Sequence, residues 1–279
     1  MPLSHFDRRI SYVFLCATPF LVGIFAAVRA LRIPGVYHAI GGVLFAAICI
    51  AAWTLGARAI RADAQDRRLL GLAGTLLVTP FALVALLWVG LGTPWQATAA
   101  ENQMRYLVLI VMSIAIAGGF VVLREALSEA GERFDATLGF AAIMLAGSLY
   151  LIWNAFMFEV FFAEAHTGQV PAALASLSKP IDILLDLGAV LIYLATAAFA
   201  ASLGRVQWLG RTATRAFIIV SFVALLFLMM RGLQYSNPAA LSTPWYTNPG
   251  FVVGIPAVPF IMPFLFGVVL LRHAGDEQH

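Results

Sequence analysis

Long apolar blocks alternate with short polar links along the whole chain of 279 residues. A block of about 20 apolar residues is long enough to cross the hydrocarbon core of a bilayer as a helix. The pattern therefore predicts an all-α, polytopic membrane bundle of about eight spanning helices. The blocks cover residues 10–29, 37–57, 69–91, 105–124, 136–164, 181–204, 213–233 and 250–271.

Composition supports a membrane protein. The chain is 62% hydrophobic and 11% charged, whereas a typical soluble domain is about 25% charged. This leaves too little polar material to cover a soluble core, and the apolar blocks leave no segment for a separate soluble domain. We expect residues 1–279 to form a single integral membrane domain that contacts lipid.

The arginines indicate an orientation for the bundle, because links on the cytoplasmic side carry an excess of Arg and Lys. If eight helices cross and both termini lie inside, twelve basic residues fall on the inner side and five on the outer side. Both termini are therefore predicted to be cytoplasmic, in a plasma or inner membrane. The inner residues are Arg8, Arg9, Arg58, Arg61, Arg67, Arg68, Arg124, Arg133, Arg205, Arg211, Arg215 and Arg272, and the outer ones are Arg29, Arg32, Arg105, Lys179 and Arg231.

Two features concern the eighth block. A "TPW" tripeptide precedes both the fourth and the eighth block, at residues 93–95 and 243–245. This pattern is compatible with a tandem repeat of four plus four helices, although the remaining blocks align poorly. The eighth block contains "GIPAVPFIMPFLFG", whose prolines remove backbone donors and should kink or break the helix.

Glu159 is an acidic residue within the apolar fifth block, where an ionisable side chain usually faces the bundle interior. At 100° per residue it shares a helix face with Ser148, Ala155 and His166. This stripe is small and polar, as a helix–helix contact face should be. We therefore expect Glu159 to face inward.

The sixth block carries a second polar stripe. Asp182 and Asp186 are four residues apart. Their face continues toward the opposite end of the helix through Ala189, Tyr193, Thr196 and Ala200. Arg231 ends the seventh block, so Glu159, Asp186 and Arg231 should lie at a similar depth on three consecutive helices. An arginine can bind a carboxylate bidentately, and we expect Arg231, or a substrate cation, to neutralise Glu159.

These residues allow three interpretations: a structural ion pair between helices, an outward-facing polar pocket, or side chains that reach to the membrane surface. The pocket hypothesis assigns substrate binding to Glu159, Asp182, Asp186, Tyr193 and Arg231. Among functions, we favour binding or transport of a small solute. The alternatives are a membrane-embedded enzyme that uses carboxylates on an apolar or lipid-like substrate, and an accessory or scaffold subunit.

The sequence lacks the motifs of several common kinds of catalytic and binding site. It contains no HExxH motif, no nucleophile elbow and no phosphate-binding glycine loop. Five scattered histidines and two cysteines within apolar blocks give no metal or haem site, so neither metal nor cofactor is expected. A single lysine and no basic cluster argue against a nucleic-acid partner.

The orientation can be tested by cysteine labelling. Cysteines placed in the 58–68 and 205–212 links should resist a membrane-impermeant thiol reagent added from the outer side, because both links are predicted to be cytoplasmic. Labelling of either link from that side in intact cells would contradict the orientation.

Overall fold

The computed structural model describes residues 5–27, 35–92, 94, 97–234, 249–255 and 257–276, and this part of the chain contains helices and no strands. The long helices are α1 (His5–Ala27), α2 (Val36–Leu55), α3 (Gln65–Gly90), α4 (Ala99–Glu129), α5 (Phe134–Thr167), α6 (Ala172–Arg205), α7 (Arg211–Gln234) and α9 (Ile261–Asp276). Two short helices, η2 (Ala57–Arg61) and α8 (Pro249–Val253), complete the described elements. The predicted all-α class is confirmed for the described residues.

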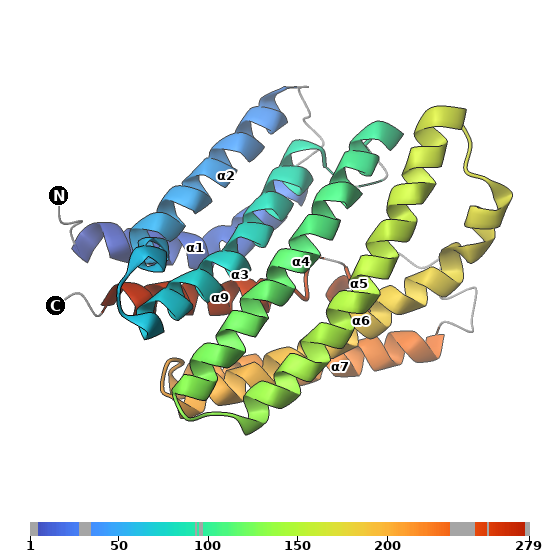
Figure 1. Ribbon diagram of the computed structural model, residues 1–279. Helices are drawn as coiled ribbons and strands as arrows, with labels where there is room; N and C mark the ends of the chain where they lie inside the picture. Colours follow the sequence, from blue (N-terminus) through green and yellow to red (C-terminus); the bar gives the residue numbers. More distant parts are fainter. Residues whose placement is uncertain are drawn as a thin grey trace.

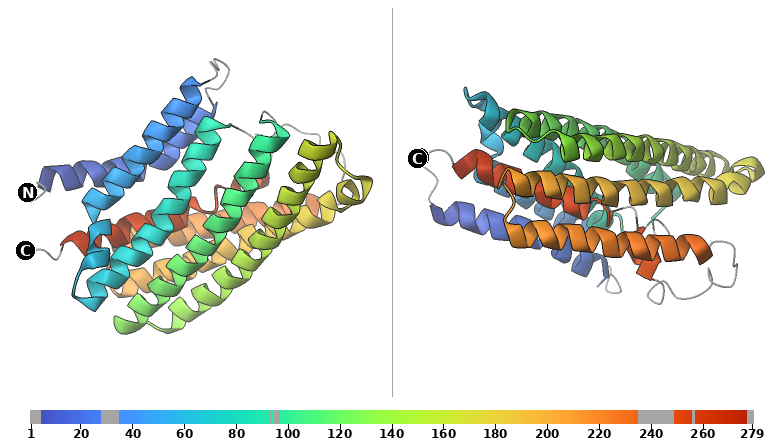
Figure 2. Two further views of the ribbon diagram at one scale, coloured as in Figure 1. Left: turned by 45° about the horizontal axis from the view of Figure 1, so that its top comes forward. Right: turned by 90° about the horizontal axis from the view of Figure 1, so that it is seen from below.

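The helices form two layers (Figure 1). Helices α2, α3, α4 and α5 lie side by side in chain order, and each contacts the next. Helices α1, α9, α6 and α7 lie behind them, as the view from below in Figure 2 shows. Because α9 packs on α3, the end of the chain returns to the middle of the bundle.

Seven helices within the described residues, α1 to α7, are long and apolar enough to cross a membrane. They correspond to the first seven predicted blocks. Helices α5 and α6 have 34 residues each, which makes each about 51 Å long. They exceed the roughly 30 Å of a bilayer core, so their ends reach beyond it.

The eighth predicted helix is broken where the prolines lie. Helix α8 ends at Val253 and α9 begins at Ile261. Three tight turns bridge the gap, in which Ile255 donates to the Val252 carbonyl at 3.2 Å, Val258 to Ile255 at 2.8 Å and Ile261 to Val258 at 3.1 Å. Pro263 falls in the first turn of α9, where a missing N–H costs little. The predicted break is confirmed, and its backbone remains largely hydrogen-bonded.

Helix α9 packs closely on α3 through two glycines. A Cβ atom added at Gly267 would lie 2.9 Å from the Gly74 carbonyl oxygen, and one added at Gly74 would lie 2.9 Å from the Gly267 carbonyl oxygen. Because the backbones approach so closely, α3 and α9 can join the two apolar cores of the bundle. One core includes Phe120, Phe199 and Phe266, and the other includes Leu15, Ile48 and Phe264.

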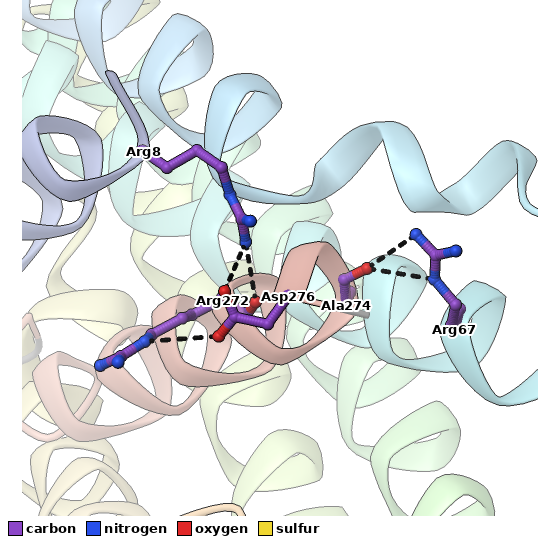
Figure 3. A network of polar contacts seen from close by, with 5 residues as sticks. All are labelled: Arg8, Arg67, Arg272, Ala274 and Asp276. Carbon is purple, nitrogen blue, oxygen red and sulfur yellow. Dashed lines mark hydrogen bonds and ion pairs between the residues drawn. The ribbon is translucent and has the colours of Figure 1, made fainter. Parts of the chain in front are cut away.

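The ends of α1 and α9 lie together at one end of the bundle (Figure 3). Arg8 Nη2 donates to Asp276 Oδ1 at 2.9 Å and to the Arg272 carbonyl at 3.3 Å. Arg67 Nη2 donates to the Ala274 carbonyl at 3.3 Å. Both carbonyls lie in the last turns of α9, and that of Ala274 is among the four without a partner within the helix. The positive charges suit the negative dipole end of α9.

Arg8 and Asp276 thus lie at the same end of the bundle, and the expectation that both termini lie on one side of the membrane stays a prediction. Which side is cytoplasmic stays a prediction. The four-plus-four repeat also stays a prediction, because residues 93, 95 and 243–245 lie outside the described residues.

The close contact between α3 and α9 can be tested by Gly267→Ala. The added Cβ would meet the Gly74 backbone, so the helices must separate, and overpacking of this kind costs about 1–3 kcal/mol of unfolding free energy. We expect a lower melting temperature in detergent. The matched control is Gly42→Ala on α2, where a Cβ meets nothing within 4 Å. Equal melting temperatures for the two variants would contradict the close packing.

Candidate functional site

The inward face of α5 differs from the predicted one. Ser148, Ala155, Glu159 and His166, which define the predicted inward stripe, are all exposed. The buried face carries Tyr150, Trp153 and Asn154, together with the small residues Ala136, Gly139 and Ala146. The prediction for Glu159 was wrong because small residues occur on both sides of this helix, so helical spacing groups the residues without showing which group is buried.

The position of Glu159 along α5 accounts for its charge. The opposite end of α5 carries a cluster in which Arg205 binds Asp135 at 2.8 Å and Glu132 at 3.3 Å. A bilayer core spans about 20 helical residues. Counted from Asp135, that distance ends about one turn before Glu159, so a position of its exposed carboxylate in the headgroup layer stays a prediction.

Arg231 pairs with Asp186 rather than with Glu159. Arg231 Nη1 lies 3.3 Å from Asp186 Oδ1, and both side chains are 18% exposed. The pair joins α6 to α7, which are in contact. The expectation that Arg231 and an α6 carboxylate lie at a similar depth is therefore confirmed, whereas the partnership with Glu159 is not seen.

Arg231 also lies against the short helix α8. A Cβ atom added at Gly254 would lie 2.6 Å from Arg231 Nη1, and one added at Gly250 would lie 2.6 Å from Arg231 Cβ. Glycine at both positions lets the end of α8 approach the guanidinium. The ion pair thus stands directly beside the break in the eighth helix.

Tyr193 secures the same break from α6. Its ring is 2% exposed, and its hydroxyl donates to the carbonyl of Val253, the last residue of α8, at 3.0 Å. A helix that ends inside a membrane leaves carbonyls without partners, and an unsatisfied group there is costly. The inward face predicted for α6 is confirmed at Tyr193, Thr196 and Ala200.

Asp182 lies at the rim of this region. It is exposed, and its Oδ1 accepts a hydrogen bond of 3.3 Å from Trp153 Nε1 on α5. Leu187, which follows Asp186 in the chain, is 49% exposed. The inward face of α6 therefore begins at Asp186 and runs toward the C-terminal end of the helix. Whether the five predicted residues bind a substrate stays a proposal.

A narrow cavity lies between α3, α4, α5 and the broken segment. Its volume is about 30 Å³, which is room for about two water molecules. A smaller space of about 10 Å³ adjoins it and shares Ser113, Ile116, Tyr150 and Phe260. The larger cavity is lined by Leu77, Pro80, Phe81, Val84, Trp88, Leu109, Met112, Ser113, Ile116, Tyr150, Trp153, Asn154, Ala257, Phe260 and Pro263.

The polar residues of this cavity, Ser113, Tyr150 and Asn154, were not predicted from the sequence pattern. Trp153 and Asn154 precede Glu159 by about one and a half turns. A polar asparagine within an apolar block was the feature that could have indicated a buried polar site here. Asn154 is 2% exposed and Ser113 is 8% exposed. Phe260 comes from the break and meets the Tyr150 ring edge to face, with centroids 5.0 Å apart. The cavity depends on contacts between distant segments.

A buried arginine lies close to one wall of the cavity. Arg105 on α4 is 0% exposed, and its guanidinium lies over the Trp88 ring, 5.1 Å from the centroid. It also donates to the Gly92 carbonyl, just beyond the end of α3. The cation therefore fixes one of the two tryptophans of the cavity. Within the described residues, no three His, Cys, Asp or Glu side chains gather closely enough to bind a metal.

A double-mutant cycle tests the ion pair. Arg231→Met should lower the unfolding free energy by about 3 kcal/mol, because it leaves the Asp186 carboxylate without its cation. Asp186→Leu should also lower it, and the double variant should lose less than the sum. Thermal or denaturant unfolding in detergent gives the three values. Glu159→Gln is the control and should change stability by less than about 0.5 kcal/mol. Additive losses in the cycle would show that the two charges are not coupled.

Comparison of the chain with family models, with curated proteins and with solved structures found no match. The function must therefore be argued from the chemistry of the site itself.

Proposed function

We propose that the protein is an integral membrane protein that binds a small solute in the cavity between α3, α4, α5 and the break in the eighth helix. One observation carries the proposal: the non-helical segment contributes Ala257 and Phe260 to a cavity that also contains the buried polar side chains Ser113 and Asn154. Broken membrane helices commonly form binding sites, because irregular backbone is tolerated where it lines a cavity.

The residues predicted from sequence support this site from the other side. Tyr193 and the Arg231–Asp186 pair hold the end of α8, and Asp182 holds Trp153. Tyr150 lies within electrostatic range of Asp186 and Tyr193. In this proposal these residues set the shape of the cavity, and Glu159 lies at the outer boundary of the membrane.

The lining favours binding over acid–base catalysis. Among the lining residues, the phenol of Tyr150 is the only ionisable group, and no carboxylate is present. A general acid or base must come within hydrogen-bond reach of the reacting atoms. Asp182 and Asp186 are not lining residues, so the alternative of an enzyme that uses these carboxylates has less support. A scaffold subunit would have no need of polar groups beside an interior cavity.

The cavity is narrow, so entry of a solute requires movement of a wall. The segment from Gly254 to Phe260 is the wall best suited to move, because tight turns rather than a continuous helix hold it. Transport would add a second opening toward the other side of the membrane. We propose binding as the core of the function and transport as its extension.

Thiol labelling distinguishes the three functions. In a protein with Cys16→Ala and Cys49→Ala, Ser113→Cys should react with a charged, membrane-impermeant methanethiosulfonate, because a solute site must open to water. Reaction from one side alone indicates binding, and reaction from either side indicates transport. The control Ser148→Cys faces away from the bundle and should react only with a lipid-permeable maleimide.

Other labelling results would contradict the proposal. Reaction of Ser113→Cys with the lipid-permeable reagent alone would indicate entry from the bilayer and favour a lipid-like substrate. No reaction with either reagent, in a variant that retains the parent melting temperature, would indicate a closed, dry interior and favour the scaffold.

A further inference from the structure

Asn154 presents a free hydrogen-bond acceptor at the cavity. The Ser113 hydroxyl donates to the Leu109 carbonyl at 2.9 Å, so its oxygen can only accept from Asn154. The Asn154 Nδ2 donates to this oxygen at 3.2 Å. The amide is assigned in the orientation that satisfies both bonds, with its nitrogen toward Ser113. Asn154 Oδ1 is buried and has no hydrogen-bond partner among the described residues.

Tyr150 adds a second polar atom one turn away on the same face of α5. Its side chain is 2% exposed, and it lines both the larger and the smaller space. The hydroxyl is buried and has no hydrogen-bond partner within the described part of the chain. A phenol hydroxyl can donate as well as accept. An unpaired buried polar group is costly, so two of them on successive turns of one helix beside one cavity need an explanation.

The remaining walls are apolar and aromatic. Trp88, Trp153 and Phe260 lie around the two polar atoms, together with leucine, isoleucine and proline side chains. A water molecule needs two to four polar partners, and these walls offer few. A molecule with one hydroxyl group and an apolar body matches the lining more closely, because its hydroxyl can donate to Asn154 Oδ1 and accept from Tyr150.

We propose that the cavity recognises a small apolar molecule through a single hydroxyl group, which Asn154 Oδ1 and the Tyr150 hydroxyl bind together. The inference rests on the proposed function and specifies the class of solute. The hydroxyl lies between two residues of α5, and the apolar body packs on Trp88, Trp153 and Phe260. Entry requires the segment between α8 and α9 to move.

Trichloroethanol is a suitable probe because it quenches tryptophan fluorescence and carries one hydroxyl on an apolar body. Trichloroethane is its matched analogue without the hydroxyl. The test protein carries four substitutions that remove the other tryptophans: Trp53→Phe, Trp95→Phe, Trp208→Phe and Trp245→Phe. Its tryptophan fluorescence then comes only from the cavity residues Trp88 and Trp153. We expect saturable quenching by trichloroethanol at concentrations about fivefold lower than by trichloroethane, the effect of one ordinary hydrogen bond.

Tyr150→Phe is the decisive variant. It removes an unpartnered hydroxyl, so it should retain or raise the melting temperature, while the preference for trichloroethanol over trichloroethane disappears. Asn154→Leu should abolish the same preference. The control protein keeps Trp53 alone, which lies 48% exposed on α2. Its quenching should be non-saturable and report only partition of the probe into lipid or detergent.

The outcomes separate this inference from the proposed function. Saturable quenching of equal strength by both probes, unchanged in Tyr150→Phe, would leave a binding cavity but overturn recognition of a hydroxyl. If quenching of Trp88 and Trp153 is non-saturable and Ser113→Cys also fails to react, the cavity holds water or nothing, and both proposals fail.

Discussion

Every backbone polar group within a bilayer needs a partner in the protein, and the break in the eighth helix is where this chain meets that constraint most severely. The described residues between Val253 and Ile261 leave the helical conformation. Successive tight turns satisfy part of their backbone, and Tyr193 supplies a hydroxyl to the terminal carbonyl of α8. Arg231 lies against Gly250 and Gly254 while it binds Asp186. The charged residues of α6 and α7 are thus tied to the stability of the break.

Helix α5 contacts the break and also lines the cavity. Trp153 lines the cavity and also donates to Asp182. Tyr150 contacts Phe260 of the break and lines the cavity, and its hydroxyl has no hydrogen-bond partner among the described residues. One helix face therefore links the polar residues of α6 to the cavity wall. A movement of the break would reach the cavity directly through the ring contact between Tyr150 and Phe260.

The opposite end of the bundle has a different role. Arg8 and Arg67 bind the last carbonyls of α9, and Arg205 joins α6 to the start of α5. Together with the glycine contact between α3 and α9, these interactions stabilise the end of the bundle where Arg8 of α1 contacts Asp276 of α9. The irregular segment, the cavity and the Arg231–Asp186 pair lie away from that end, where the structure offers room for a conformational change.

The sequence alone determined the features that depend on local chemistry. Apolar length set the seven long helices, the prolines set the place of the break, and the stripe through Tyr193 and Thr196 set the inward face of α6. Tertiary packing decided the rest. Both sides of α5 carry small and apolar residues, so helical spacing could not show that Asn154, rather than Glu159, faces inward. Arg231 could have paired with Glu159 or with Asp186. The packing of α6 on α7 brought Asp186 within reach. The bonds of Asn154 to Ser113 and of Tyr193 to Val253 join residues 41 and 60 positions apart, and the cavity exists only where such distant segments meet.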